Sequence, residues 1–268
     1  SRGHPENQAA IARSGALAPL CTMVRDAPTP ETREESAGAL WSMAHENAAN
    51  KATIAKLGGI EPLVSMLMFA STDNSCVKSG GALATLSTKH NENRLLIVKR
   101  FVHVLSCKVP HERAIRLMSA VVTMCDYDTL NQIAVAKLGG VQHVITWLGH
   151  PDEKTQAQAA QAMLAIAANN ATTQAHIASL EGIPPLVELV RKGTIEAQEH
   201  STCALWHLAS LKKNRWLIKE CDGIPPLVGL LLLEGSSLAP QIATMLLLRL
   251  AEGSTRAAVA IAEAGGIL

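Results

Sequence analysis

The chain has 268 residues, of which 48% are hydrophobic, 18% charged and only 3% aromatic, and its formal net charge is +1. Its hydrophobic content argues against disorder. A net charge near zero argues against a global field that attracts nucleic acid or an anionic membrane. No apolar run approaches the roughly 20 residues that a membrane-spanning helix needs. We therefore expect a folded chain without an integral membrane segment.

A short phrase recurs along the chain. Its clearest copies are Gly182-Ile-Pro-Pro-Leu-Val187 and Gly223-Ile-Pro-Pro-Leu-Val228. The first apolar residues of all copies, one of them degenerate, are Leu17, Ile60, Val102, Val141, Ile183, Ile224 and Ile267. Successive members of this series are 39 to 43 residues apart. A period of about 40 to 47 residues is typical of solenoids built from two- or three-helix repeats.

This register divides the chain into six repeats and the start of a seventh. The predicted repeats span residues 7–49, 50–92, 93–130, 131–172, 173–213, 214–256 and 257–268. The last one stops one residue into a helix, and we therefore expect the chain to be a fragment of a longer protein.

Residues 50–92 show how one repeat is predicted to fold. Asn50 is expected to cap a short first helix, because its side chain can accept a hydrogen bond from an unpaired backbone N–H. Gly58-Gly59 ends that helix, since Gly tolerates the left-handed conformation found after a helix C-terminus. Pro62 lies in the first turn of the second helix, where its missing N–H costs nothing. A third helix is expected from about Cys76 to Ser87.

The other repeats follow this pattern with one departure. Asn7, Asn93, Asn131 and Asn214 each precede an apolar residue by four positions, as Asn50 does, and are predicted to cap first helices. In the third repeat Arg100-Phe101 replaces the Gly pair. Its first two helices are therefore expected to run on or to meet at an altered angle.

The order of short helix, Gly break, Pro-containing second helix and long third helix resembles the armadillo repeat family over essentially the whole chain. HEAT repeats share the period but lack this Gly break. The resemblance implies an all-α, right-handed superhelical solenoid that forms one continuous domain over residues 1–268. It also implies a binding scaffold whose third helices line a concave groove, which can hold a peptide or a longer partner segment.

The resemblance further indicates where a partner would bind. Importin-α-type repeats carry a ladder of groove Asn residues that holds a peptide backbone, with a Trp four residues before each Asn. The Asn positions here hold Ser42, Thr85, Thr123, Ala165, His207 and Arg249, and no Trp occupies the position four residues earlier. Recognition through side chains or shape is therefore favoured over backbone clamping. The predicted partner-binding residues are Trp41, Ser42, His45, Thr85, Thr88, Thr123, Asp126, Gln161, Trp206, His207, Ser210 and Arg249.

Two of the four tryptophans allow two interpretations. Trp41 and Trp206 occupy the same repeat position. They serve either as aromatic anchors for a partner or as packing between adjacent third helices, because an amphipathic ring suits both. Trp147 and Trp216 fall on second and first helices and are interpreted as structural.

A basic stretch lies in and around the third repeat. Between Lys89 and Arg116 the chain has seven Lys or Arg residues and two Glu residues. The possible basic patch comprises Arg94, Lys99, Arg100, Arg113 and Arg116. It is either a site for an acidic partner or a phosphate, or a solvated surface spread over three helices.

No metal, cofactor or catalytic site is predicted. His200, Cys203 and His207 share one helix face, but about 10 Å separates the two histidines along the axis, too far for one zinc ion. The chain has no P-loop, no dinucleotide-binding glycine motif, no H-E-x-x-H and no G-x-S-x-G. Six cysteines lack C-x-x-C and metal-finger spacings, which indicates reduced thiols and a cytoplasmic or nuclear location.

The predicted function is therefore that of a non-catalytic scaffold or adaptor that binds an extended or helical segment of another protein. Three alternatives remain open. The first is self-association into a homo-oligomer, and the second is binding of cargo in the manner of nuclear transport receptors. The missing Asn ladder disfavours the second. The third is contact with nucleic acid or a membrane surface through the basic stretch, for which strong salt dependence of binding is expected.

Overall fold

The computed structural model describes residues 4–107, 109–126, 128–232 and 238–266. Within these ranges the chain forms 18 helices and no strand, which confirms the all-α prediction. None of the described helices is long and apolar enough to cross a membrane. Lys108 of the basic stretch and the register residue Ile267 lie outside the described residues.

The chain divides into two compact units, Ser1–Ala134 and Val135–Leu268, which we call unit 1 and unit 2. The boundary falls inside helix α9 (Thr129–Lys137). Each unit is described below by itself. The single continuous domain expected over residues 1–268 stays a prediction.

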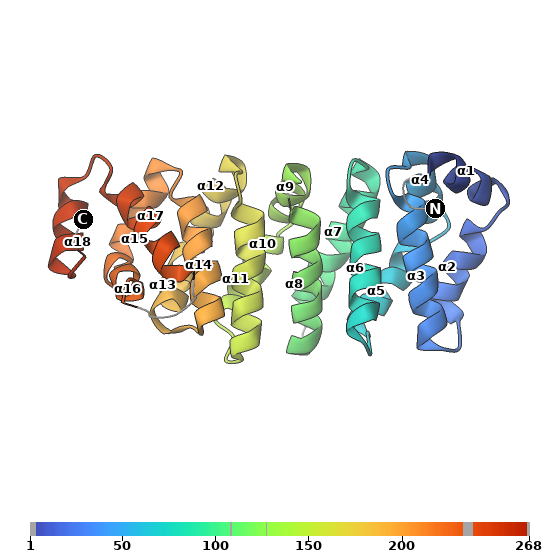
Figure 1. Cartoon of the computed structure of the whole chain (residues 1–268), viewed down its shortest axis with the longest axis horizontal. Helices are drawn as coiled ribbons and strands as arrows, with labels where there is room; N and C mark the ends of the chain where they lie inside the picture. The colour runs from blue at the N-terminus through green and yellow to red at the C-terminus, as the bar shows by residue number, and fades with distance from the viewer. Residues whose placement is uncertain (1–3, 108, 127, 233–237, 267–268) are drawn as a thin grey trace. The chain divides into compact units, whose positions relative to one another are not determined.

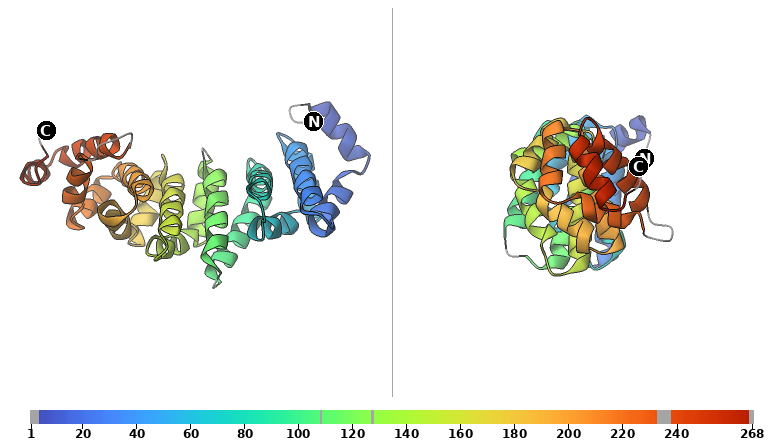
Figure 2. Two further views of the ribbon diagram at one scale, coloured as in Figure 1. Left: turned by 60° about the horizontal axis from the view of Figure 1, so that its bottom comes forward. Right: turned by 90° about the vertical axis from the view of Figure 1, so that its left-hand side faces the viewer.

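Unit 1 contains two three-helix repeats, a two-helix repeat and the beginning of α9 (Figure 1). Its third helices pack side by side, α3 on α6 and α6 on α8, and the left view of Figure 2 shows the same succession in blue, cyan and green. The helices before α9 are α1 (Pro5–Arg13), α2 (Leu17–Asp26), α3 (Pro30–Ala44), α4 (Ala48–Lys56), α5 (Ile60–Met68), α6 (Asp73–Ser87), α7 (Asn91–Ser106) and α8 (His111–Cys125).

Unit 2 contains the rest of the fourth repeat, two further three-helix repeats and one more first helix. Its third helix α14 packs against both α11 and α17. After α9 the helices are α10 (Gly140–Leu148), α11 (Glu153–Ala167), α12 (Ala171–Ser179), α13 (Ile183–Lys192), α14 (Ile195–Leu208), α15 (Lys212–Glu220), α16 (Ile224–Leu230), α17 (Ala239–Ala251) and α18 (Thr255–Glu263).

The Gly pair separates first and second helices as predicted. Gly58 has a φ of 73°, a conformation that only Gly adopts at little cost. A Cβ on Gly59 would lie 2.8 Å from the Ile54 side chain, so this residue must also stay small. Glu181 and Asp222 take the left-handed position in repeats 5 and 6, with φ of 58° and 56°. The sharp turn is thus required in these repeats even where its first residue is not Gly.

The third repeat lacks this turn and has a continuous helix instead. The 16-residue helix α7 runs from Asn91 through Arg100-Phe101 to Ser106. Phe101 is buried, so its aromatic ring contributes to the core at the point where other repeats break. The expectation that the first two helices of this repeat run on is confirmed.

The predicted N-caps are wrong by one turn. Asn47 caps α4, since its Oδ1 atom accepts from the backbone N of Asn50 at 3.0 Å. Asn50 lies at the third position of the helix, is buried, and donates from Nδ2 to the Met43 carbonyl at 2.9 Å. His90 replaces Asn93 as the cap of α7 in the same way. The sequence pattern alone did not distinguish an amide that accepts at a helix start from one that donates to the preceding helix.

The buried amides form a ladder between repeats. Asn93 donates to the carbonyls of Leu86 and Lys51 at 3.2 and 3.1 Å. Asn214 donates to those of Leu208 and Gln174 at 3.0 and 3.3 Å. Each amide thus satisfies a carbonyl at the C-terminal end of the preceding third helix and one on the preceding first helix, which ties successive repeats together.

Candidate binding faces on the third helices

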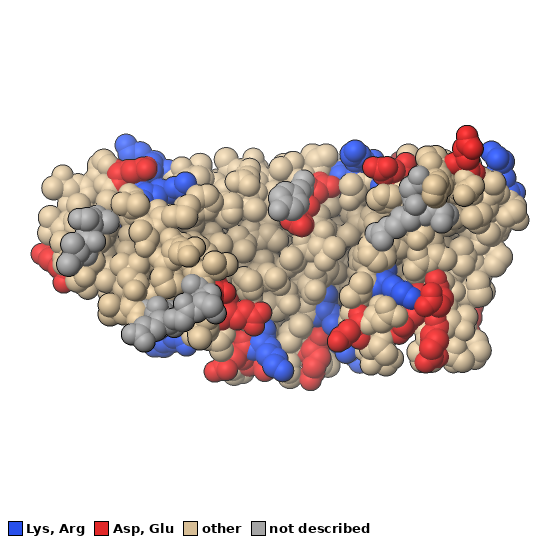
Figure 3. Space-filling model, in the orientation of Figure 1, with Lys and Arg blue, Asp and Glu red and all other residues tan. Residues whose placement is uncertain are grey.

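The outward side chains of the third helices form one candidate binding face in each unit. The face of unit 1 comes from α3, α6 and α8, and the face of unit 2 from α11, α14 and α17. Inward residues such as Leu40, Leu83 and Leu205 are fully buried and hold these helices in place. In the view of Figure 3, Lys, Arg, Asp and Glu lie mainly toward the upper and lower edges, and other residues make up most of the area between them.

Trp41 packs against the next third helix in unit 1. A Cβ on Gly81 of α6 would lie 2.7 to 2.8 Å from atoms of the Trp41 ring, so the indole lies directly on the helix backbone there. Lys78 of α6 likewise packs over Gly38 of α3, and a Cβ on Gly38 would lie 3.3 Å from Lys78 Cδ. The Lys78 Nζ is 2.6 Å from a Glu35 oxygen. Two small residues are thus covered by large side chains of the neighbouring helix, which supports the packing interpretation of Trp41.

The other predicted residues of unit 1 lie toward the C-terminal ends of the third helices. Ser42, His45, Thr85 and Thr88 are half-buried, whereas Thr123 and Asp126 are exposed. Several hydroxyls bond within their own helix, as when Thr123 Oγ1 donates to the Ser119 carbonyl at 3.1 Å. Val77 of α6 is exposed one turn before Gly81 and was not predicted, because its register position lies outside the flanks of the inward Leu.

Trp206 in unit 2 has different surroundings. The guanidinium carbon of Arg249 lies 4.3 Å from the centroid of the Trp206 ring, a cation–π geometry. Arg249 Nη1 also donates to the Trp206 carbonyl at 2.9 Å. The His207 ring meets Trp206 edge-on with centroids 4.9 Å apart, and its Nδ1 accepts from the Asn169 backbone N at 3.4 Å. These three predicted residues therefore form one half-buried cluster.

The surroundings of two histidines on this face favour the neutral imidazole. Burial lowers the pKa of His207, and the charge of Arg249 lowers it further. Burial also lowers the pKa of His200, against the opposing effect of Glu196 and Glu199. Burial and then Glu199 raise the pKa of the Cys203 thiol. At neutral pH the positive charge of the cluster therefore resides on Arg249.

The remaining predicted residues of unit 2 are polar, and exposed apolar side chains occur on the third helix α17. Gln161 Oε1 accepts from Gln158 Nε2 at 2.8 Å, and Ser210 Oγ donates to Gln174 Oε1 at 2.6 Å. On α17, Met245 and Leu248 are 49% and 52% exposed. Exposed apolar side chains with polar neighbours are a common feature of protein interaction surfaces.

Comparisons with known proteins support the same architecture. Residues 4–45 match the model of the armadillo/beta-catenin-like repeat family. An engineered protein of known structure is 25% identical over 98% of this chain and 64% of that chain, with a TM-score of 0.70. A designed armadillo repeat protein is 17% identical over 87% of this chain and 99% of that chain, with a TM-score of 0.64. The chain therefore has the armadillo-repeat fold, and its residues 4–45 match the family model.

Another designed armadillo repeat protein was solved in complex with the peptide (KR)4. It is 16% identical over 87% of this chain and 99% of that chain, with a TM-score of 0.66. A comparison with curated proteins gave no match. At these identities the designed structures establish the armadillo fold of this chain.

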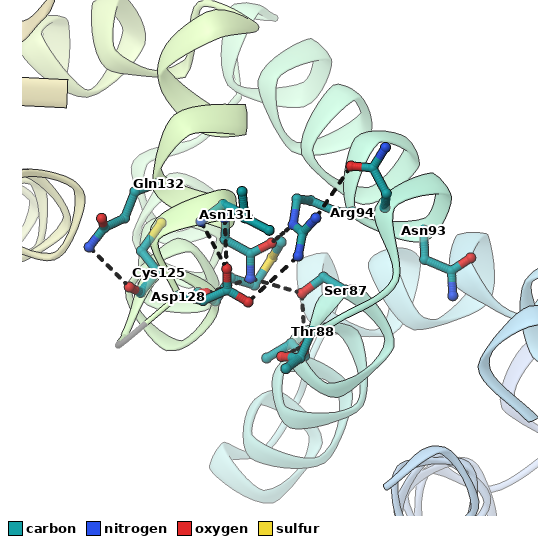
Figure 4. A network of polar contacts seen from close by, with 12 residues as sticks. Ser87, Thr88, Asn93, Arg94, Cys125, Asp128, Asn131 and Gln132 are labelled. Carbon is teal, nitrogen blue, oxygen red and sulfur yellow. Dashed lines mark hydrogen bonds and ion pairs between the residues drawn. The ribbon is translucent and has the colours of Figure 1, made fainter. Parts of the chain in front are cut away.

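The basic stretch of the third armadillo repeat is not one surface patch. Arg94 is only 3% exposed; its Nε donates to Asn131 Oδ1 at 2.8 Å and its Nη2 lies 3.8 Å from Asp128 Oδ2 (Figure 4). Asn131 in turn donates to the Met124 carbonyl at 2.6 Å and to Ser87 at 3.2 Å. Arg94 therefore belongs to the ladder between armadillo repeats, and its burial removes it from any surface site.

The other basic residues take separate places on the same repeat. Arg100 pairs with Glu61 of α5 at 2.6 Å, while Lys99 is exposed. Arg113 lies 4.3 Å from the centroid of the exposed Phe69 ring, and Arg116 donates to the Met68 carbonyl at 2.9 Å. The structure thus brings Arg113 and Arg116 together at the end of α5, but leaves the remaining members apart.

Two clefts lie beside the second helices. In unit 1 a cleft of about 770 Å³ is lined by residues of α2, α3, α5 and α6, including Arg33, Pro62 and Phe69. In unit 2 a cleft of about 640 Å³ lies among α15, α16 and α18. Trp216 lines it and is 55% exposed, contrary to the structural role expected for this residue.

Proposed function

We propose that this chain is a non-catalytic protein-binding scaffold that holds an extended or helical segment of a partner on its third-helix faces. The observation that carries the proposal is the face of unit 2, where Met245 and Leu248 are exposed beside the Trp206, His207 and Arg249 cluster. Aromatic and Arg residues are enriched where binding energy concentrates in interfaces. Apolar side chains next to them supply area that a partner can bury.

The designed armadillo repeat protein that was solved with a peptide supports this proposal, because it has the same fold. Support also comes from the distribution of charge. Most of the area between the charged edges in Figure 3 is formed by other residues, so a partner can cover it without desolvating many ionised groups. The polar residues at its edges are then available to fix orientation.

Peptide selection on the intact chain tests the proposal. Phage-displayed random peptides are selected on immobilised protein, and fluorescence anisotropy measures the affinity of those recovered. The double variant Met245→Ser/Leu248→Ser should weaken them at least about tenfold, because it removes two apolar contacts at roughly 25 cal/mol per Å². Val259→Ser is the matched control, since Val259 is 49% exposed on α18, outside the third helices.

Two results decide the proposal. Equal affinity of the wild-type chain and the double variant would place the binding elsewhere and refute it. Sedimentation of the chain alone tests the alternative of self-association. A mass that rises with concentration in the wild-type chain but not in the double variant would assign this face to a second copy of the chain.

A further inference from the structure

We infer that Arg249, held on Trp206, is a recognition point for an Asp or Glu side chain of the bound segment. This inference rests on the proposed function, since it concerns the chemistry of the partner on the third-helix face of unit 2. It goes beyond it by stating which kind of side chain the partner must present, and where.

Arg249 is oriented but not neutralised. Its guanidinium lies over the Trp206 ring at 4.3 Å, and its Nη1 donates to the Trp206 carbonyl at 2.9 Å. A guanidinium has five N–H donors in one plane. No ion pair of Arg249 occurs within the described residues. The remaining donors are therefore positioned without a carboxylate to receive them.

Three carboxylates on or next to α14 and α17 are engaged elsewhere, and one of them, Glu196, lies 3.8 Å from His200 Nε2. Glu252, three residues after Arg249, pairs with Arg215 Nη1 at 2.9 Å. Glu199 lies about two turns before Trp206 on α14, and its Oε1 accepts from the backbone N of Leu238 at 2.9 Å. The acid that completes Arg249 must therefore come from outside this set of residues.

The surrounding charge has the right sign for such an acid. Lys212 and Lys213 begin α15 immediately beyond α14, both are exposed, and neither forms an ion pair in the described part of the chain. With Arg249 they place three cations near the C-terminal end of α14. A carboxylate that approaches there meets attraction from all three, and the two lysines mainly raise its rate of association.

Stacking also favours a carboxylate over a weaker acceptor. The planar guanidinium can donate two parallel hydrogen bonds to a carboxylate. Because Trp206 already restricts the Arg249 side chain, less conformational entropy is lost when the bond forms. Met245 lies one turn before Arg249 on α17 and is exposed. The expected partner segment therefore carries an apolar residue close to its acidic one.

Charge-neutral peptide pairs test the inference. Each peptide selected on the wild-type chain is resynthesised with Asp→Asn and Glu→Gln, and both versions are measured by fluorescence anisotropy on four proteins. These are the wild-type chain, Arg249→Gln, Arg249→Lys and the matched control Arg256→Gln, which removes the same charge from an exposed position on α18. Circular dichroism establishes that all four are folded.

Neutralising the peptide should weaken binding to the wild-type chain and to Arg256→Gln by about tenfold, the order expected for one charge-assisted hydrogen-bonded pair. The same change in the peptide should weaken its binding to Arg249→Gln by less than about twofold. Binding to Arg249→Lys should weaken by an intermediate factor, since Lys keeps the charge but not the planar guanidinium.

The outcomes separate this inference from the proposed function. If selected peptides lose affinity for Met245→Ser/Leu248→Ser but neutral and acidic versions bind the wild-type chain equally, the face binds peptides and only the inference fails. An equal penalty for neutral peptides on the wild-type chain and on Arg249→Gln also overturns it, because the acid then binds elsewhere. Selected peptides that are insensitive to the double variant refute the proposed function itself.

Discussion

Trp41 and Trp206 occupy the same position in their repeats but have different surroundings. The Trp41 ring lies on the backbone of the next third helix, because the facing residue is Gly81. In the repeat after Trp206 the residue equivalent to Gly81 is Met245, and the Trp206 ring lies under Arg249 instead. The difference teaches that the residue on the neighbouring helix, and not the tryptophan itself, decides whether the indole packs on a helix backbone or supports a surface group.

The largest expected effect is the loss of Trp41. Trp41→Ala should lower the free energy of unfolding by about 3 kcal/mol, because an indole packed against a helix backbone leaves a cavity. Urea denaturation followed by circular dichroism measures this change. The control is Trp216→Ala, which should lower the free energy of unfolding much less, because Trp216 is 55% exposed. A loss below about 1 kcal/mol for Trp41→Ala would mean that this ring is not a packing element.

Gly81→Ala tests the contact with Trp41 from the neighbouring helix. The added methyl would meet the Trp41 ring at 2.7 Å, which is too close for carbon atoms. Destabilisation of about 1 to 3 kcal/mol is expected from such overpacking. In the Trp41→Ala background the penalty should largely disappear, and a double-mutant cycle measures this coupling. Additive losses would contradict direct contact between the two residues.

Trp206→Ala should lower the free energy of unfolding by less than Trp41→Ala does. Its ring is half-buried like that of Trp41 but lies under Arg249, and this interaction is worth about 0.5 to 1 kcal/mol at an exposed site. Its substitution should instead reduce peptide binding, because Arg249 loses the surface that orients it. Parallel denaturation and anisotropy measurements on both tryptophan variants test this reversal. A smaller loss in the free energy of unfolding for Trp41→Ala than for Trp206→Ala would contradict the different roles of the two rings.

The smallest effect concerns the titration of His207. Arg249→Gln should raise the pKa of His207, because the Arg249 charge disfavours the imidazolium form; burial, the larger cause of the lowered pKa, remains. Nuclear magnetic resonance of the imidazole protons as a function of pH measures the shift. Arg256→Gln on α18 serves as a charge-matched control, and an unchanged pKa in Arg249→Gln would show that the guanidinium does not act on His207.

The same lowered pKa gives a sign for the pH dependence of stability. Because the folded pKa of His207 lies below its unfolded value of about 6.5, the unfolded chain binds more protons between the two values. The contribution of His207 to stability is therefore complete above the unfolded pKa and declines as the pH falls through and below it. His200 acts in the same direction. In Arg249→Gln this decline should be shallower.

Much of the fold could be predicted because it depends on local chemistry. Gly58-Gly59 forces a turn, and the absence of such a pair at Arg100-Phe101 allows α7 to continue, so both were readable from the sequence. The exchange of roles between Asn47 and Asn50 was not, because each amide can donate or accept and only the packing of α4 on the preceding helix decides which. Local signals determine the register, whereas contacts between repeats depend on tertiary packing.

The candidate site was predictable to a smaller extent. Register placed Trp206, His207 and Arg249 on successive third helices, but nothing in the sequence showed that Arg249 lies over Trp206. Arg94 appeared as a surface charge because its burial depends on Asn131 and Asp128, which are 37 and 34 positions away in the chain. Side chains whose partners are one repeat away are therefore the ones that periodicity misplaces.

The ladder of buried amides has a consequence for how such a chain can change its length. Asn93 and Asn214 donate to main-chain carbonyls in the preceding repeat, and every residue type offers such a carbonyl. The joint therefore does not depend on which side chains its neighbours carry. Insertion, duplication or exchange of a whole repeat leaves these bonds intact, so new binding surfaces can be assembled without redesigning the joints.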